Sequence, residues 1–562
     1  MNQVYLKLPL AFFLFLTLIF VSCQEKNPAP SREIIDELKL KKGEVITCGA
    51  SGSQFGSVEF GTSCSKKVKK EFSLAIELLH SFEYDESEKV FAKIIDTEPQ
   101  CAMAYWGVAM CNYHPLWTPP AEAELKKGAK AVEIAKSIKG ISKREEGYID
   151  AIAAFYTDWK SLGHQTRCLL FENKMAKLYA DYPGDPEAAI FYALALDASA
   201  DPTDLTYSNQ KKAGRILYKL YPDQQNHPGI AHYIIHTYDD PVLAPEALAV
   251  VRRYASIAPS SAHAQHMPSH IFTRLGLWDE SIKSNIASIA SARCYAETAG
   301  LEGHWDEELH GLDYLVYAYL QKGEDSLAKA QWKYLQTISR VDPVNFKVAY
   351  AFAAIPSRYL LENSFWKEAA DIKLYPVNFP WQKFPWQEAI FHFTRLMGCV
   401  HTGKIQTANA ELQVLKAKYD TLIIQKDLYK SNEVKIQILT AEAWILYQQG
   451  ENSAALQQMR LAADMEDKRE KNPVSPGEII PARELLGDME LQMNKPESAL
   501  SDYQKDLMKH ANRFNGLYGA GLAAEKSGRN TVAFFYYRQL LLQSFSGQGG
   551  RPELARIKQL LK

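Results

Sequence analysis

A short element that recurs along the chain sets the strongest limit on its fold. A glycine-like turn residue is followed five residues later by alanine or serine. Such recurrence indicates stacked helical hairpins, because a small side chain lets two antiparallel helices approach closely. The pairs are Gly276 with Ser281, Gly323 with Ala328, Ser364 with Ala369, Gly403 with Ala408, Gly450 with Ala455, Asn494 with Ala499 and Gly528 with Ala533, with looser matches at Phe82 and Ser87 and at Val242 and Ala247.

The segments around these turns resemble the middle of tetratricopeptide repeats, as in LGLWDESI, QKGEDSLA, QQGENSAA and NKPESALSDY. From Glu71 onward the hydrophobic periodicity is helical, so no strands are expected. The resemblance implies an all-α fold, a right-handed α-solenoid of tetratricopeptide-type helix-turn-helix repeats. About nine repeats are visible within residues 66–545.

The N-terminus has the features of an export signal. Lys7 precedes an apolar run from Leu8 to Val21, which is too short to span a bilayer. The run ends at Ser22-Cys23, which resembles a bacterial lipoprotein signal and implies that Cys23 carries the lipid. Ordinary secretion with cleavage near Ser22 is the alternative. We expect an exported protein anchored by lipid at the cell outer membrane, facing the periplasm or the surface.

Four segments follow from these features. We expect a signal peptide at 1–22, a lipid-anchored tether at 23–65, N-terminal repeats at 66–300 and C-terminal repeats at 301–562. Within the tether, Cys48 and Cys64 bracket a Gly-rich stretch, and a disulfide closing that short loop is the simplest interpretation outside the cytoplasm. Seven cysteines remain besides Cys23, so at least one is free or intermolecular.

Histidines cluster in one part of the chain, since eight of the fourteen lie from His227 to His310. One pair with helical spacing, His232 and His236, recurs 34 residues later as His266 and His270. The turn residues Val242 and Gly276 have the same offset, so equivalent places in successive repeats carry histidine. The next offset, from Gly276 to Gly323, maps His263 onto His310, His266 onto Asp313 and His270 onto Tyr317.

The resemblance implies that these places line the concave groove of the solenoid. Neighbouring helices pack about 8–10 Å apart, so their side chains can converge. Neutral imidazole suits zinc, copper, nickel and iron, and a carboxylate completes many such sites. We therefore predict one or two transition-metal ions or another small ligand at His232, His236, His266, His270 and Asp313, with His263, His310 and Tyr317 in support.

Three classes of function remain open. The first is a binding module that presents the groove to a metal, an envelope protein, a peptide or a glycan. The second is a metal-dependent hydrolase or oxidase, with Glu307, Glu308 or Asp239 as candidate general bases. Trp117 and Trp305 are separate candidates for an aromatic wall, although aromatic residues in helical repeats more often serve packing. The third is a scaffold in an outer-membrane nutrient or glycan uptake system, in which the histidines are only packing residues.

Charge excludes one class of partner. The 64 basic and 66 acidic side chains leave no positive field for nucleic acid. No GxSxG or HExxH motif is present, so the sequence names no catalytic mechanism.

Overall fold

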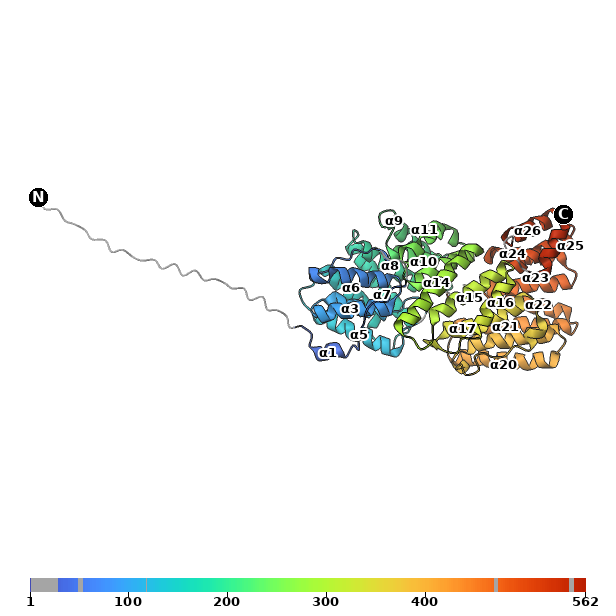
Figure 1. Cartoon of the computed structure of the whole chain (residues 1–562), viewed down its shortest axis with the longest axis horizontal. Helices are drawn as coiled ribbons and strands as arrows, with labels where there is room; N and C mark the ends of the chain where they lie inside the picture. The colour runs from blue at the N-terminus through green and yellow to red at the C-terminus, as the bar shows by residue number, and fades with distance from the viewer. Residues whose placement is uncertain (2–28, 49–53, 118, 470–473, 545–549, 562) are drawn as a thin grey trace.

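The computed structural model describes Met1 and residues 29–48, 54–117, 119–469, 474–544 and 550–561 (Figure 1). Helices make up most of these ranges, so the all-α fold is confirmed. Cys23, the expected lipidation site, lies outside the described residues. Among the helices that the structure describes, none is both long and apolar enough to cross a membrane.

Consecutive helices pack against each other through the first part of the chain. They are α1 (Arg32–Asp36), the 3-10 helix η1 (Lys66–Val68), α2 (Lys69–His80), α3 (Tyr84–Thr97), α4 (Ala102–Cys111), α5 (Glu122–Ser137), α6 (Lys143–Tyr156), α7 (His164–Asp181), α8 (Pro186–Ala198), α9 (Ser208–Leu220), α10 (Pro228–Thr237) and α11 (Ala244–Ile257).

The middle of the molecule contains the only two strands in the described ranges. Two short strands pair in parallel, and no strand had been expected there. The elements are α12 (Ala262–His266), α13 (Pro268–Arg274), α14 (Trp278–Ala299), β1 (His304–Trp305), α15 (Asp306–Gln321), α16 (Asp325–Leu335) and β2 (Val341–Asp342).

The C-terminal helices continue the same pattern of neighbour packing. They are α17 (Phe346–Glu362), α18 (Trp366–Ala370), the 3-10 helix η2 (Trp381–Lys383), α19 (Pro385–His401), α20 (Ile405–Ile424), α21 (Leu428–Gln448), α22 (Asn452–Asp467), α23 (Ala482–Gln492), α24 (Pro496–Lys509), α25 (Phe514–Lys526), α26 (Asn530–Gln543) and α27 (Pro552–Leu560).

The predicted repeat register is visible in the backbone. Eight of the nine predicted turn residues, all except Val242, have a positive φ, with values between 53° and 84°. Residues in this left-handed region end a helix and reverse the chain. The small residue that follows each turn is buried, from Ser87 at 0% exposure to Ala533 at 1%. The helix-turn-helix repeat is therefore confirmed in both of its defining positions.

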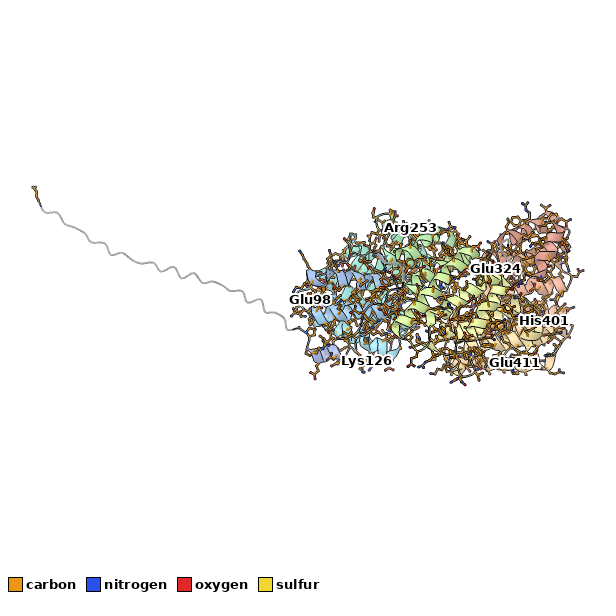
Figure 2. The ribbon with its side chains drawn as sticks, in the orientation of Figure 1. Glu98, Lys126, Arg253, Glu324, His401 and Glu411 are labelled. Carbon is orange, nitrogen blue, oxygen red and sulfur yellow. A yellow bond between two sulfur atoms is a disulfide. The ribbon has the colours of Figure 1, made fainter. Side chains whose placement is uncertain are left out.

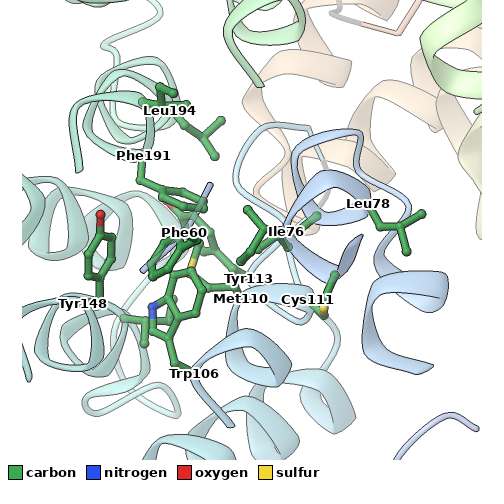
Figure 3. Packing of buried hydrophobic residues seen from close by; sticks show 14 of the residues in the cluster. Phe60, Ile76, Leu78, Trp106, Met110, Cys111, Tyr113, Tyr148, Phe191 and Leu194 are labelled. Atoms are coloured by element: carbon green, nitrogen blue, oxygen red, sulfur yellow. The ribbon is translucent and has the colours of Figure 1, made fainter. Parts of the chain in front are cut away.

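The segment before the first repeat is part of the packed core. Phe60 is 4% exposed, and its ring centroid lies 5.5 Å from that of Trp106 and 5.1 Å from that of Tyr148 (Figure 3). Phe55 and Val58 are buried in the same cluster. Residues 54–64 thus pack onto the repeats, whereas we expected a tether as far as residue 65.

The two disulfides differ from the predicted one. Cys48 bonds Cys294 in α14, and Cys64 bonds Cys101 at the start of α4. The predicted Cys48–Cys64 pairing is wrong because Phe55 and Phe60 pack into the core, and the two cysteines contact different helices. The free cysteines of the described chain are Cys111, Cys168 and Cys399, all buried.

The C-terminal repeats fold back against the middle of the chain, near α14 and α15 (Figure 1). Trp278 Nε1 donates to the carbonyl of Asn512 at 3.0 Å, and Asn512 Nδ2 donates to the carbonyl of Gly276 at 3.3 Å. A Cβ at Gly276 would lie 2.5 Å from the Ala511 carbonyl oxygen, so this contact requires glycine. Side chains such as Lys126 and Arg253 lie at the outer edges of the molecule (Figure 2).

Candidate metal centre

Three consecutive hairpins bring the predicted histidines together. Helix α10 carries His232 and His236 on one face, and it begins at Pro228, where a proline without an N–H is tolerated. The next repeat is broken into α12 and α13 at Pro268, which places His266 and His270 on two short helices. Helix α15 supplies His310.

Six histidines form two groups. The first histidine group is His232, His236 and His263, and the second is His266, His270 and His310. Within each group, one ring nitrogen from each histidine lies within 4.8 Å of the corresponding nitrogens of the other two. The repeat offsets that relate His232 to His266, His236 to His270 and His263 to His310 therefore relate the first group to the second, member by member. The ring centroids of His236 and His270 are 6.2 Å apart, so the groups are adjacent.

The ring nitrogens converge at the spacing of metal ligands. Nε2 of His232 lies 3.0 Å from Nε2 of His236 and 3.1 Å from Nε2 of His263. In the second group, Nε2 of His266 lies 3.1 Å from Nε2 of His270. Two nitrogens bound to one tetrahedral ion at about 2.0–2.1 Å lie about 3.3 Å apart, which is close to these values.

Neighbouring groups fix which nitrogen of each ring carries its proton. Nδ1 of His232 donates to the carbonyl of His80 at 2.6 Å. Nδ1 of His266 donates at 2.7 Å to Oδ1 of Asn285, whose amide donates to the Ser281 carbonyl at 2.8 Å and is thereby oriented. Such partners orient metal-binding histidines and leave Nε2 as the ligand atom.

Asp239 fixes the protonated nitrogen of His270 in the second histidine group. Its Oδ2 accepts from Nδ1 of His270 at 2.9 Å, and its Oδ1 accepts from Nε of Arg274 at 3.0 Å. Burial alone would raise the pKa of Asp239, but Arg274 and His270 outweigh burial and lower it, so the carboxylate is ionised. It can therefore only accept a hydrogen bond, and His270 must be the donor.

The consequence is a pair of lone pairs that face each other. Both His266 and His270 use their proton at Nδ1, so neither Nε2 has a proton to place in the 3.1 Å between them. A cation between them removes this repulsion. Burial and neighbouring histidines lower the pKa of His266 well below its usual value, which disfavours a proton in that role. A metal ion fits the donor set.

A third cluster of titratable groups has a different arrangement. In the Glu187 group, Oε1 of Glu187 accepts from Nε2 of His227 at 2.8 Å, and Oε2 accepts from Nε2 of His80 at 2.9 Å. The remaining nitrogens are also partnered, because Tyr233 OH lies 2.9 Å from Nδ1 of His80 and the Ile230 N–H donates to Nδ1 of His227. Each donor has an acceptor, so this cluster needs no ion.

Two cavities reach the first histidine group. One, of about 320 Å³, is lined by His236, Asp239 and Arg274 together with other polar residues. The other, of about 310 Å³, is lined by His263 and Glu307 and by several aromatic side chains. Three histidines leave coordination positions of a transition metal open, and at the first histidine group these cavities give small molecules access to such positions.

Two predicted site residues lie elsewhere. Asp313, expected as a ligand, is ion-paired to Arg358, and Tyr317, expected in support, accepts a hydrogen bond from Nη1 of Arg513 at 3.1 Å. Both predictions are corrected. Asp313 pairs with Arg358 of α17 in the next hairpin, whereas Tyr317 lies where the C-terminal repeats cover α15 and faces Arg513 rather than an open groove.

Two of the three candidate general bases border the histidine groups, and the third does not. Asp239 contacts His270, and Glu307 Oε2 lies 3.9 Å from Nδ1 of His263, so both border the histidines. Glu308 is directed away and is bonded to Arg293, His304 and Tyr334, each at 2.7 Å.

Three contributors were not predicted. Asn285 lies inside α14 without any repeat signal, and the carbonyl of His80 comes from a helix far away in sequence. The ring of Tyr314 lies 4.7 Å from that of His266 and 5.0 Å from that of His270. Only Tyr314 had a signal, since it follows His310 by one helical turn.

No family model matches the sequence, and no curated protein does. Solved structures that are similar to this chain include human IFIT1 dimer with PPP-AAAA, at 10% identity and TM-score 0.32, covering 83% of this chain and 94% of that one. Another is the APC/C hetero-tetramer Cut9-Hcn1, at 12% identity and TM-score 0.26, covering 88% and 97%. These scores are too low to support an argument, so the repeat assignment rests on the turns and buried small residues of the chain itself.

Proposed function

We propose that this protein is a transition-metal protein that holds one ion at the first histidine group and a second ion at the second group. The observation that carries the proposal is the pair of unprotonated Nε2 atoms of His266 and His270, 3.1 Å apart in a buried site. Six imidazoles without a carboxylate among them favour zinc, copper, nickel or iron over magnesium or calcium.

The open coordination positions and the two cavities favour chemistry on a small molecule. We therefore place metal-dependent catalysis, as a hydrolase or an oxidase, ahead of metal storage. A bound ion would supply Lewis acidity or redox chemistry, while Asp239 orients His270 and Arg274 holds Asp239. Glu307 borders the aromatic cavity and is the carboxylate best placed to contact a substrate.

The test is the metal content of protein purified without a histidine tag. We expect two equivalents of one transition metal per chain, measured by inductively coupled plasma mass spectrometry. The double variant His232→Ala with His266→Ala should lose both, whereas His304→Ala, whose histidine lies outside both groups and is partly exposed, should keep both. A metal-free wild-type protein that also takes up no added zinc or copper would contradict the proposal.

A second candidate function is binding of an envelope protein, a peptide or a glycan. Helical repeats offer extended surfaces for partners, and α26 exposes Phe535 at 63% and Leu542 at 75%. Capture of a defined partner that depends on Phe535 but not on metal would favour this function.

Export and lipid anchoring at the outer membrane belong to the same proposal. The two disulfides support it, because such bonds persist in oxidising compartments. Radiolabelled palmitate incorporation that is lost in Cys23→Ser would test it, and secretion of the unlabelled wild-type protein would contradict the anchor.

A further inference from the structure

The cavity beside His263 has an unusual lining. Its walls include five aromatic residues from separate parts of the chain, which are Phe82, Tyr84, Trp117, Trp305 and Phe346. Its volume of about 310 Å³ is roughly twice that of an engineered cavity of about 150 Å³ that admits benzene. A flat ring system therefore fits within it, and aromatic walls favour stacking or edge-to-face contact with such a ring.

The aromatic wall is continuous with the first histidine group. The ring centroid of Trp117 lies 5.2 Å from that of His236 and 5.9 Å from that of His263. Phe82 lies 4.4 Å from His232 by the same measure. A molecule held against these rings is thus beside the proposed metal ligands.

One polar atom in this wall has an unused hydrogen-bonding capacity. Oε2 of Glu307 is buried, and among the described residues it has no hydrogen-bond partner. Nδ1 of His263 lies 3.9 Å from this oxygen, which is within ion-pair range but beyond hydrogen-bond distance. The other oxygen, Oε1, accepts from Nζ of Lys347. A buried acceptor without a donor is costly, so a ligand that brings a donor to Oε2 is favoured.

We infer that this cavity binds an aromatic molecule bearing a hydroxyl group, with the hydroxyl donating to Oε2 of Glu307 and the ring lying against Trp117. This inference rests on the proposed function and deepens it, because it names a phenolic substrate class for the site beside the first histidine group. The cavity on the other side, lined by His236 and Arg274, is polar and offers no comparable wall.

Phenol and anisole are the matched probes, since they share a ring and differ in the hydroxyl donor. Binding to the full mature protein is measured by ligand-observed nuclear magnetic resonance titration. A hydrogen bond to a charged acceptor predicts about tenfold or greater preference for phenol. In Glu307→Gln the preference falls to about threefold or less, because a neutral amide is a weaker acceptor than a carboxylate. Trp117→Ala weakens both ligands alike.

The matched control is Glu308→Gln, which changes the adjacent carboxylate outside the cavity and should leave the preference unchanged. Lys347 also pairs with Asp306, 2.7 Å away, so it keeps one carboxylate partner in Glu307→Gln. An unchanged affinity for anisole then reports an intact cavity. If Glu307→Gln also loses anisole binding, the preference for phenol over anisole is measured instead in Glu307→Asp, which keeps the charge. Equal affinities for phenol and anisole in wild type, or a preference that survives both variants, would overturn the inference.

Titrations of chelator-treated and zinc-loaded protein separate this inference from the proposed function. Glu307 is not among the proposed ligands, so its preference for phenol should appear in both forms. Preference without any metal uptake would remove only the two-metal proposal. Metal uptake without preference would remove only the phenolic substrate class.

Discussion

Two clusters of buried histidines in this molecule, the Glu187 group and the second histidine group, differ in how their hydrogen bonds are completed. In the Glu187 group a carboxylate lies between His80 and His227, and all ring nitrogens have partners. In the second histidine group, His266 and His270 direct unprotonated nitrogens at each other. The comparison teaches that histidine content and burial do not define a metal site. The balance of donors and acceptors does.

The Glu187 group is joined to the first histidine group. His80 contributes its side chain to the Glu187 group, while its backbone carbonyl accepts from Nδ1 of His232 at 2.6 Å. The Glu187 group therefore orients His232, a member of the first histidine group.

Loss of metal is the largest effect that this comparison predicts. The variant His266→Ala with His270→Ala should bind one ion fewer than wild type, and His227→Ala should bind as many as wild type. At free metal about 1,000-fold above its dissociation constant, each ion stabilises the fold by about 4 kcal/mol. Calorimetry with and without zinc measures the gain. Equal zinc-dependent gains in all three proteins would show that the second group holds no ion.

Breaking the Glu187 group should lower the stability of the fold without changing its metal content. Glu187→Gln leaves two histidines without their buried carboxylate and should destabilise the fold by about 3–5 kcal/mol. Denaturant unfolding of the metal-free protein gives this number. Metal content should stay at the wild-type value, so a variant that loses its ions while remaining folded would contradict the separation of the two clusters.

The stability difference between wild type and Glu187→Gln should depend on pH because the pKa of Glu187 is shifted in the folded protein. Burial would raise the pKa of Glu187, but His227 and His80 outweigh it and lower the pKa to about 2. A carboxylate with a depressed pKa stabilises the fold above its unfolded value of about 4.5 and loses this contribution as the pH falls toward 2, a change of about 3 kcal/mol. The stability gap between wild type and Glu187→Gln should therefore narrow from about pH 5 downward. A gap that widens in acid would show that this carboxylate is not ionised in the folded protein.

A smaller effect sharpens the comparison within the metal centre itself. Asp239→Asn keeps the size of the side chain but weakens its hold on His270, and loss of such a partner costs about 10- to 100-fold in metal affinity. Competition with a chromogenic chelator should show one weakened ion and one unchanged ion. Uniform weakening of both would mean that the groups do not bind independently.

The sequence predicted the repeat and much of the centre, for physical reasons that can be named. Turn residues such as Gly323 and their buried partners such as Ala328 depend on local backbone geometry, which a repeat displays directly. The same register placed His232 and His236 on one face and paired them with His266 and His270. It also related His263 to His310, although we assigned these two residues only a supporting role.

What could not be predicted depends on contacts between distant parts of the chain. Tyr317 occupies a predicted groove position, yet Arg513 donates to it because the C-terminal repeats cover that face. Cys48 bonds Cys294 rather than its near neighbour Cys64 for a similar reason, since Phe60 is drawn into the core. Repeat patterns describe neighbouring hairpins and carry no information on how the array returns to itself.

That return has a consequence for how the molecule unfolds. In a simple repeat array each hairpin depends on its neighbours alone, so terminal hairpins fray while the centre persists. Here Asn512 near the C-terminus is bonded to Gly276 and Trp278, and Cys48 near the N-terminus is covalently bound to Cys294. Both ends are therefore fastened to the same central hairpin. The array should melt cooperatively as one unit, and α13 of that hairpin carries His270 of the histidine centre.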